Sequence, residues 1–184
     1  MSLDREFLEY PMRRHGMDHD RYEWSMLADR APRRWPGDRP LALWINLSLE
    51  HFPLNPKGEG FKPHGSMLMP YPDLRHYTLR DYGNRVGVFR VLDALDQAGL
   101  RASAAVNGEL ALRYPSLLRR LRARSSELVA HGWNMDSVHH GGLAPEREAE
   151  LIARTLEALA PWSDAPIRGW LSPARSQSQL TPEL

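Results

Sequence analysis

Four short apolar runs alternate with segments of helical periodicity, and this alternation constrains the fold more than any other feature of the sequence. The first run is nearly continuously apolar at its start, which is typical of a strand buried on both faces of a parallel sheet. Strand–helix alternation predicts parallel strands joined by right-handed crossovers. We therefore expect an α/β fold whose strands are residues 41–49, 101–106, 127–130 and 167–171.

Three segments between the runs carry helix signals. The segment that begins at Asn84 places apolar residues at helical spacing and stops at Gly99. Pro115 and Pro145 each suit the first position of a helix, where the missing N–H is not needed. Residues 52–83 are rich in proline and glycine, and we predict a long loop there.

Composition limits the domain count, the partners and the location. The 184 residues suffice for one domain with a sizeable core, and we divide them into an irregular arm, residues 1–39, and a domain, residues 40–184. Lys and Arg number 24 against 23 Asp and Glu, a balance that argues against a nucleic-acid partner. No apolar run is long enough for a bilayer, and the N-terminus lacks the layout of a signal peptide. We expect a cytoplasmic protein with no membrane partner.

Polar residues stand where the predicted strands end. Because the carboxyl ends of parallel strands lie at one edge of a sheet, Glu50, Asn107 and His131 are expected to converge there. Glu50 can act as a general base or a metal ligand, and an exposed charged pair with His51 is the structural alternative. His131 can bring an imidazole to a substrate or simply bond neighbouring backbone. Asn107 can orient a substrate carbonyl, and a turn or cap role explains it equally well.

A second set of residues near the same edge is predicted to bind substrate. The set comprises His51, Trp133, Asp136, Trp170 and Arg175. For Trp170, packing in the core is the alternative. The sequence contains no nucleophile elbow, phosphate loop or dinucleotide fingerprint, so acyl-serine and nucleotide chemistry have no support.

The order of these pieces resembles the polysaccharide deacetylase superfamily, in particular the branch that includes metal-independent allantoinases. This resemblance implies a distorted (β/α) barrel and hydrolysis of non-peptide C–N bonds, commonly N-acetyl groups on sugars. The family domain continues beyond the last matching stretch, so we expect the N-terminal portion of such a barrel, incomplete at the C-terminus. The matching stretches are residues 34–37 leading into 41–51, then 81–88, 131–133 and 168–173.

The resemblance also raises the question of a metal. Metal-dependent members use an Asp-Asp pair after the first strand and a His-x-x-x-His pair. Glu50 matches the metal-binding Asp while Ser48 stands where the base would be, and His131 matches the first His while Met135 occupies the second position. A thioether is a poor ligand for such an ion.

The ligand set therefore stays open. No cofactor is certain, and a divalent metal such as zinc, held by Glu50 and His131, is one expectation. His139 or His140 is the candidate third ligand, with a surface histidine pair as the alternative. Without a metal, Glu50 and His131 would handle protons, and backbone N–H groups near Gly132 would stabilise an oxyanion.

The function expected from these features is hydrolysis of a C–N bond in a carbohydrate or another small molecule. A sugar N-acetyl group is the first candidate substrate, and a small cyclic amide, as for an allantoinase, is the second. The non-catalytic alternative is a protein that only binds a carbohydrate or small molecule. A homo-oligomer is a further expectation, because an open barrel would leave an unpaired edge.

Overall fold

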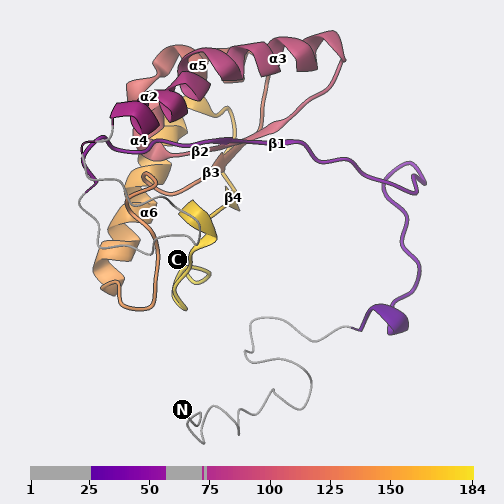
Figure 1. Ribbon diagram of the computed structural model, residues 1–184. Helices are drawn as coiled ribbons and strands as arrows, with labels where there is room; N and C mark the ends of the chain where they lie inside the picture. Colours follow the sequence, from indigo (N-terminus) through magenta and orange to yellow (C-terminus); the bar gives the residue numbers. More distant parts are fainter. Residues whose placement is uncertain (1–25, 57–71, 73) are drawn as a thin grey trace, which may run out of the picture. The chain divides into compact units, whose positions relative to one another are not determined.

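The computed structural model describes residues 26–56, residue 72 and residues 74–184 (Figure 1). The chain divides into two compact units, Met1–Leu43 and Trp44–Leu184. In the first unit, the described residues form a short 3-10 helix, Leu27–Asp29, and an antiparallel bridge between Trp35 and Arg39. Most of the predicted N-terminal arm, and residues 57–71 and 73 of the predicted loop, lie outside the described residues.

The second unit is built on four parallel strands in the order β1-β2-β3-β4. Each strand pairs with the next one along the chain, so the predicted parallel α/β arrangement is confirmed (Figure 1). The register places Leu49 opposite Val106, Val106 opposite Ala130 and Ala130 opposite Trp170. The carboxyl ends of the strands therefore form one row. The strands are β1 (Asn46–Leu49), β2 (Ser103–Val106), β3 (Leu128–Ala130) and β4 (Gly169–Trp170).

The first strand is shorter than predicted. The sequence favoured a strand over residues 41–49, but the ladder begins only at Asn46, opposite Ser103. Leu41, Leu43 and Trp44 are 77%, 76% and 71% exposed. An apolar run becomes a buried strand only where a neighbouring strand and a core lie beside it, which the local sequence does not specify.

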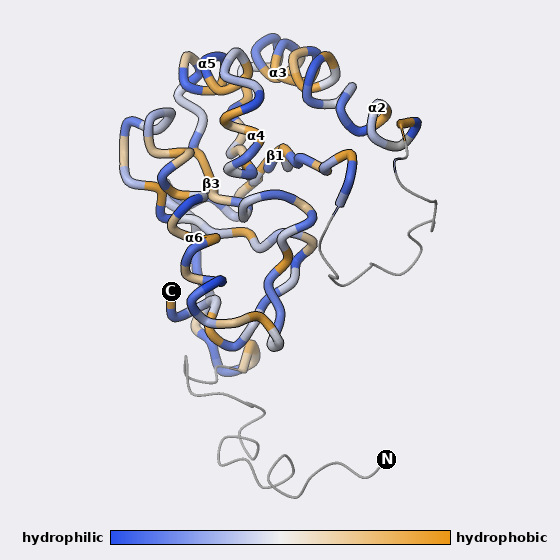
Figure 2. Tube along the Cα trace, turned by 90° about the vertical axis from the view of Figure 1, so that its left-hand side faces the viewer, coloured by the Kyte–Doolittle hydropathy of each residue, from blue (hydrophilic) through white to orange (hydrophobic). Residues whose placement is uncertain are grey.

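The helices follow the strands in alternation. Helices that open at Pro115 and Pro145 are confirmed. In Figure 2, helices α3, α5 and α6 mix hydrophobic and hydrophilic residues along the tube, as expected for helices with one buried face. None of the described helices is both long and apolar enough to cross a membrane. The elements are α2 (Leu74–Tyr82), a π-helical stretch (Gly83–Gly87), α3 (Val88–Gln97), α4 (Gly108–Arg113), α5 (Pro115–Ala123), α6 (Pro145–Leu159) and 3-10 helices at Ala160–Trp162 and Pro173–Arg175.

Two helical segments, α2 and α4, were not predicted from the sequence. The helix predicted from Asn84 begins ten residues earlier as α2 and continues through the π-helical stretch into α3, so residues 74–83 are not a loop. Leu74 and Leu79 of α2 are 62% and 69% exposed. Because α2 does not bury a stripe of leucines, its sequence lacks the apolar repeat by which a helix is recognised. Helix α4 follows β2 directly and is too short to show periodicity.

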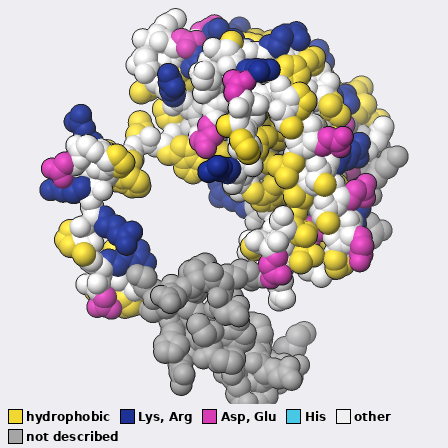
Figure 3. Space-filling view, turned by 180° about the vertical axis from the view of Figure 1, so that it is seen from behind, with side chains coloured by type: hydrophobic (Ala, Val, Ile, Leu, Met, Phe, Trp, Pro, Cys, Tyr) yellow, Lys and Arg dark blue, Asp and Glu magenta, His cyan; other side chains and the backbone are white. Residues whose placement is uncertain are grey.

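The core lies between the strands and helices α3–α6. Leu117, Leu118 and Leu121 of α5 are almost completely buried, as their spacing predicted. They pack with Leu92 of α3 and with the β2 residues. Other large hydrophobic side chains stay at the surface, and Figure 3 shows such side chains interspersed with charged ones. This core fixes the strands and so fixes where their polar ends project.

Candidate functional site

The centre of the candidate site is a pair formed by Glu50 and His131. Glu50 follows β1 and His131 follows β3, and the row of strand ends brings them together. The distance from His131 Nε2 to Glu50 Oε1 is 3.3 Å. The His131 side chain is 4% exposed and that of Glu50 is 33% exposed. The expected convergence is thus observed, while the catalytic roles of the two residues stay predictions.

The imidazole of His131 is held in one orientation by its other nitrogen. Nδ1 lies 2.6 Å from the carbonyl oxygen of Leu171, which can only accept a hydrogen bond. Nδ1 therefore carries a proton, and Nε2 faces the Glu50 carboxylate. Two acceptors would repel each other at this distance, so one further proton, on Nε2 or on the carboxyl group, makes the contact favourable. The geometry places a ring nitrogen and a carboxylate oxygen at hydrogen-bonding distance, an arrangement suited to proton transfer.

Gly132 allows the segment after β4 to approach closely. Its φ is +67°, a conformation that disfavours a side chain. A Cβ at this position would lie 2.7 Å from two ring carbons of Pro173. Leu171 N–H also donates to Ala130 O at 2.8 Å. The segment after β4 is therefore seated directly against the turn that carries His131.

Asn107 joins the two halves of the site through the backbone. Its side chain is completely buried. Oδ1 accepts the N–H of His51 at 2.7 Å, and Nδ2 donates to the carbonyl oxygen of His131. Both ends of the amide hold backbone groups, and the side chain is completely buried, so no part of it is exposed to a substrate. These contacts favour the structural alternative for Asn107, and its catalytic role stays a prediction.

His51, which follows Glu50, contacts Glu109 rather than the Glu50–His131 pair. Successive residues of an extended strand point to opposite faces, and His51 Nε2 lies 3.3 Å from Glu109 Oε1. Glu109 also accepts a 2.6 Å hydrogen bond from Asn134. Burial lowers the pKa of His51, and the negative charge of Glu109 opposes this effect. His51 therefore lies in a polar cluster with Glu109, and its predicted substrate-binding role stays a prediction.

Trp133 has no free ring face for a sugar. It is 7% exposed, and the Arg154 guanidinium lies 3.6 Å from its ring centroid. A Cβ added to Gly108 would lie only 3.0 Å from the same ring. These contacts favour a packing role for Trp133, and its predicted role in substrate binding stays a prediction.

The other predicted substrate-binding residues lie in β4, in the turn after β4 and in the loop after β3. Trp170 is partly buried and packs against the hydrophobic core, which favours the packing alternative, and its Nε1–H donates to Ser172 Oγ at 2.9 Å. Asp136 is partly buried, and its N–H donates to Asn134 Oδ1 at 3.0 Å. Arg175 is exposed at the end of a 3-10 turn. Substrate binding by Asp136 and Arg175 stays a prediction.

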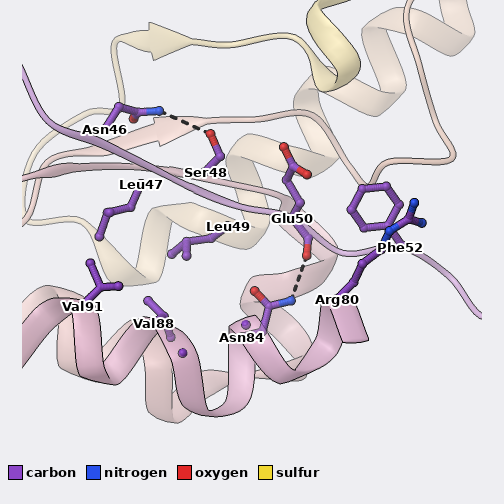
Figure 4. A pocket seen from close by; sticks show the side chains of 12 residues that line it. Asn46, Leu47, Ser48, Leu49, Glu50, Phe52, Arg80, Asn84, Val88 and Val91 are labelled. Carbon is purple, nitrogen blue, oxygen red and sulfur yellow. Dashed lines mark hydrogen bonds between the residues drawn. The ribbon is translucent and has the colours of Figure 1, made fainter. Parts of the chain in front are cut away.

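An open pocket of about 430 Å³ reaches Glu50. Figure 4 shows that Leu47 and Leu49 point toward helix α3, while Glu50 points its carboxylate the other way. Asn84 donates to the backbone carbonyl of Glu50 at 2.8 Å, and the Arg80 guanidinium lies near the rim, 4.0 Å from the Phe52 ring centroid. Sequence reasoning missed these neighbours of Glu50 because α2 shows no apolar periodicity.

The donor set in the described part of the chain does not fit a zinc ion. Within residues 26–56, 72 and 74–184, no three His, Asp or Glu side chains gather in a way that could hold a metal. His139 is completely buried with Nδ1 on Glu148 at 2.9 Å. His140 is exposed, and its Nδ1 accepts the N–H of Gly142. Neither completes a ligand set with Glu50 and His131, since a structural or catalytic zinc needs at least three protein ligands.

The fold and the position of the paired residues define an α/β protein with a polar centre at the strand ends. The family model for polysaccharide deacetylases matches residues 76–184, more than half of the sequence. The chain belongs to the polysaccharide deacetylase family.

Solved structures show the same fold. A "probable Polysaccharide deacetylase" from Pseudomonas aeruginosa PAO1 is 21% identical with a TM-score of 0.69, covering 83% of this chain and 53% of that one. Puue Allantoinase gives the same values: 21% identity, a TM-score of 0.69, and coverage of 83% and 53%. This chain thus spans about half the length of these proteins. No curated protein matches it.

Proposed function

We propose that this chain contributes the Glu50–His131 centre of a hydrolase that acts on non-peptide C–N bonds, with a carbohydrate N-acetyl group as substrate. The observation that supports this proposal is the 3.3 Å contact between the two side chains at the strand ends of a polysaccharide deacetylase fold. Hydrolysis of an amide needs a group that takes a proton from water and returns it to the leaving nitrogen.

In this proposal the two residues work as one proton carrier. His131 Nδ1 donates to Leu171 O, so Nε2 and the Glu50 carboxylate are the groups left to exchange protons with the substrate and water. They accept the proton of the attacking water and then deliver it to the nitrogen as the C–N bond breaks. Backbone N–H groups near Gly132 are proposed to stabilise the oxyanion. The carbonyl carbon gains the hydroxyl oxygen, and an amine leaves.

An allantoinase-like hydrolase of a small cyclic amide is the second candidate. It is favoured by the lack of a third metal ligand among the described residues and by the fold shared with Puue Allantoinase. A protein that only binds carbohydrate is less well supported, because Arg154 occupies the face of Trp133. A cytoplasmic location and a homo-oligomeric state belong to the same proposal.

The test is hydrolysis of N-acetylglucosamine oligomers and of allantoin by the wild type and by Glu50→Gln. Glutamine keeps the shape of the side chain but cannot take up the proton, so we expect a loss of about 10²- to 10⁴-fold in kcat/KM. Glu146→Gln, on the exposed start of α6, is the matched control and should leave turnover unchanged. Acetate release would identify a deacetylase, and ureide hydrolysis the second candidate. Turnover that survives Glu50→Gln would refute both.

A further inference from the structure

A second carboxylate–histidine pair lies buried away from Glu50. His139 is completely buried and Glu148, in the first turn of α6, is 1% exposed. His139 Nδ1 lies 2.9 Å from Glu148 Oε1. Burying a carboxylate is costly unless it is paired and hydrogen-bonded, and the proposed reaction uses neither residue. The pair therefore needs an explanation of its own.

Three donors converge on the Glu148 carboxylate. Ser178 Oγ–H donates to it at 2.6 Å, Thr181 donates from its hydroxyl, and His139 Nδ1 completes the set. Burial opposes ionisation, but these hydrogen bonds outweigh it and lower the pKa of Glu148. The carboxylate accepts only, so His139 must carry its proton on Nδ1. His139 Nε2 is buried and has no hydrogen-bond partner among the described residues.

The cluster is connected to the segment that holds His131. The backbone N–H of His139 donates to Ser176 Oγ at 3.1 Å, and Ser176 Oγ–H donates to Pro173 O at 2.7 Å. The ring of His139 also meets the Trp170 ring edge-on, with centroids 5.5 Å apart. Trp170 directly precedes Leu171, whose carbonyl accepts from His131 Nδ1, and Pro173 follows Leu171 by two residues. Through His139, the buried Glu148 carboxylate is therefore connected to the chain before and after the Leu171 carbonyl.

We propose that Glu148 is a positioning residue that, through His139 and Ser176, holds the segment from Trp170 to Pro173 and so fixes the tautomer and orientation of His131. A ring nitrogen presents its lone pair correctly only if the other nitrogen is fixed by a hydrogen bond, and such supporting contacts must themselves be held. The consequence for function rests on the proposed role of His131. The positioning itself is a property of the protein without substrate.

The experiment is a long-range ¹H–¹⁵N spectrum of the histidine rings in the substrate-free protein, with the His131 signals assigned by their loss in His131→Asn. In the wild type, neutral His131 should show the Nδ1–H tautomer. In Glu148→Gln the amide cannot accept from three donors, so the segment loosens and the Nε2–H tautomer should appear. Glu150→Gln, at an exposed residue of the same helix paired only with Arg147 among the contacts seen, is the matched control and should keep the wild-type pattern.

A second variant tests the same proposal in case Glu148→Gln does not fold. Ser176→Ala leaves Glu148 intact but removes the link between His139 N–H and Pro173 O, and it should cause the same change at His131. A wild-type His131 pattern in a folded Glu148→Gln protein, or in folded Ser176→Ala if Glu148→Gln does not fold, would overturn the proposal. If neither substrate is hydrolysed but the tautomer changes, the positioning role stands and the proposed reaction fails.

Discussion

Replacing Gly132 with alanine tests how closely the segment after β4 is seated on the site. The substitution has two separate costs. At φ +67° an alanine is strained, by about 1–2 kcal/mol. The new Cβ would also lie 2.7 Å from Pro173 Cδ and Cγ, and overpacking of this kind costs about 1–3 kcal/mol. We expect Gly132→Ala to lower the free energy of unfolding by about 3 kcal/mol in total.

Gly99 provides the matched control, because it separates the two costs. Its φ is +64°, but nothing lies within 4 Å of a Cβ placed there. Gly99→Ala should therefore lose only the strain term, about 1–2 kcal/mol. Urea unfolding with unchanged m values measures both losses. Equal midpoints for the two variants would refute the close contact between Gly132 and Pro173, and with it the seating of the Leu171 carbonyl on His131.

Three further predictions concern the buried polar groups around the site. Burial lowers the pKa of His51 in the folded state. Below about pH 6.5 the unfolded chain therefore binds the proton more readily than the folded one, and stability should fall as the pH drops through that value. His51→Gln should flatten this part of a thermal-unfolding pH profile. If His51→Gln has the same pH profile as the wild type, His51 is not buried as described. Asn107→Ala leaves the N–H of His51 and the carbonyl of His131 without their partner and should cost about 2–5 kcal/mol in urea unfolding. A loss under about 1 kcal/mol would mean that the two hydrogen bonds of the Asn107 amide are not formed. Burial and the nearby Asp81 raise the pKa of Tyr114 to about 12, so ultraviolet titration should show this phenol still protonated where ordinary tyrosines ionise, and Tyr114→Phe should remove that late step.

The meeting of Glu50 and His131 was predictable because it follows from topology alone. Parallel strands end at one edge, and both residues stand directly after a strand. The orientation of the side chains was not predictable. Whether His51 faces the pair or a neighbouring helix depends on the exact end of β1 and on Glu109, which lies in a helix too short to leave a pattern.

The roles of Asn107 and Trp133 show a second limit. Both residue types suit a binding site, and both stand near the strand ends. Their partners come from distant parts of the chain: Arg154 of α6 covers Trp133, and the backbone of His51 and His131 engages Asn107. Only the packed structure decides whether a polar or aromatic group at such a site is free.

That Glu50 and His131 act as one proton-sharing unit is tested most directly by a double-mutant cycle. The variants are Glu50→Gln, His131→Asn and the double variant, compared in kcat/KM on the substrate that the wild type hydrolyses. If the two residues form one unit, each single variant should lose nearly as much as the double variant. Losses that multiply in the double variant would mean that the residues act independently, and turnover close to wild type in either single variant would contradict a shared catalytic role.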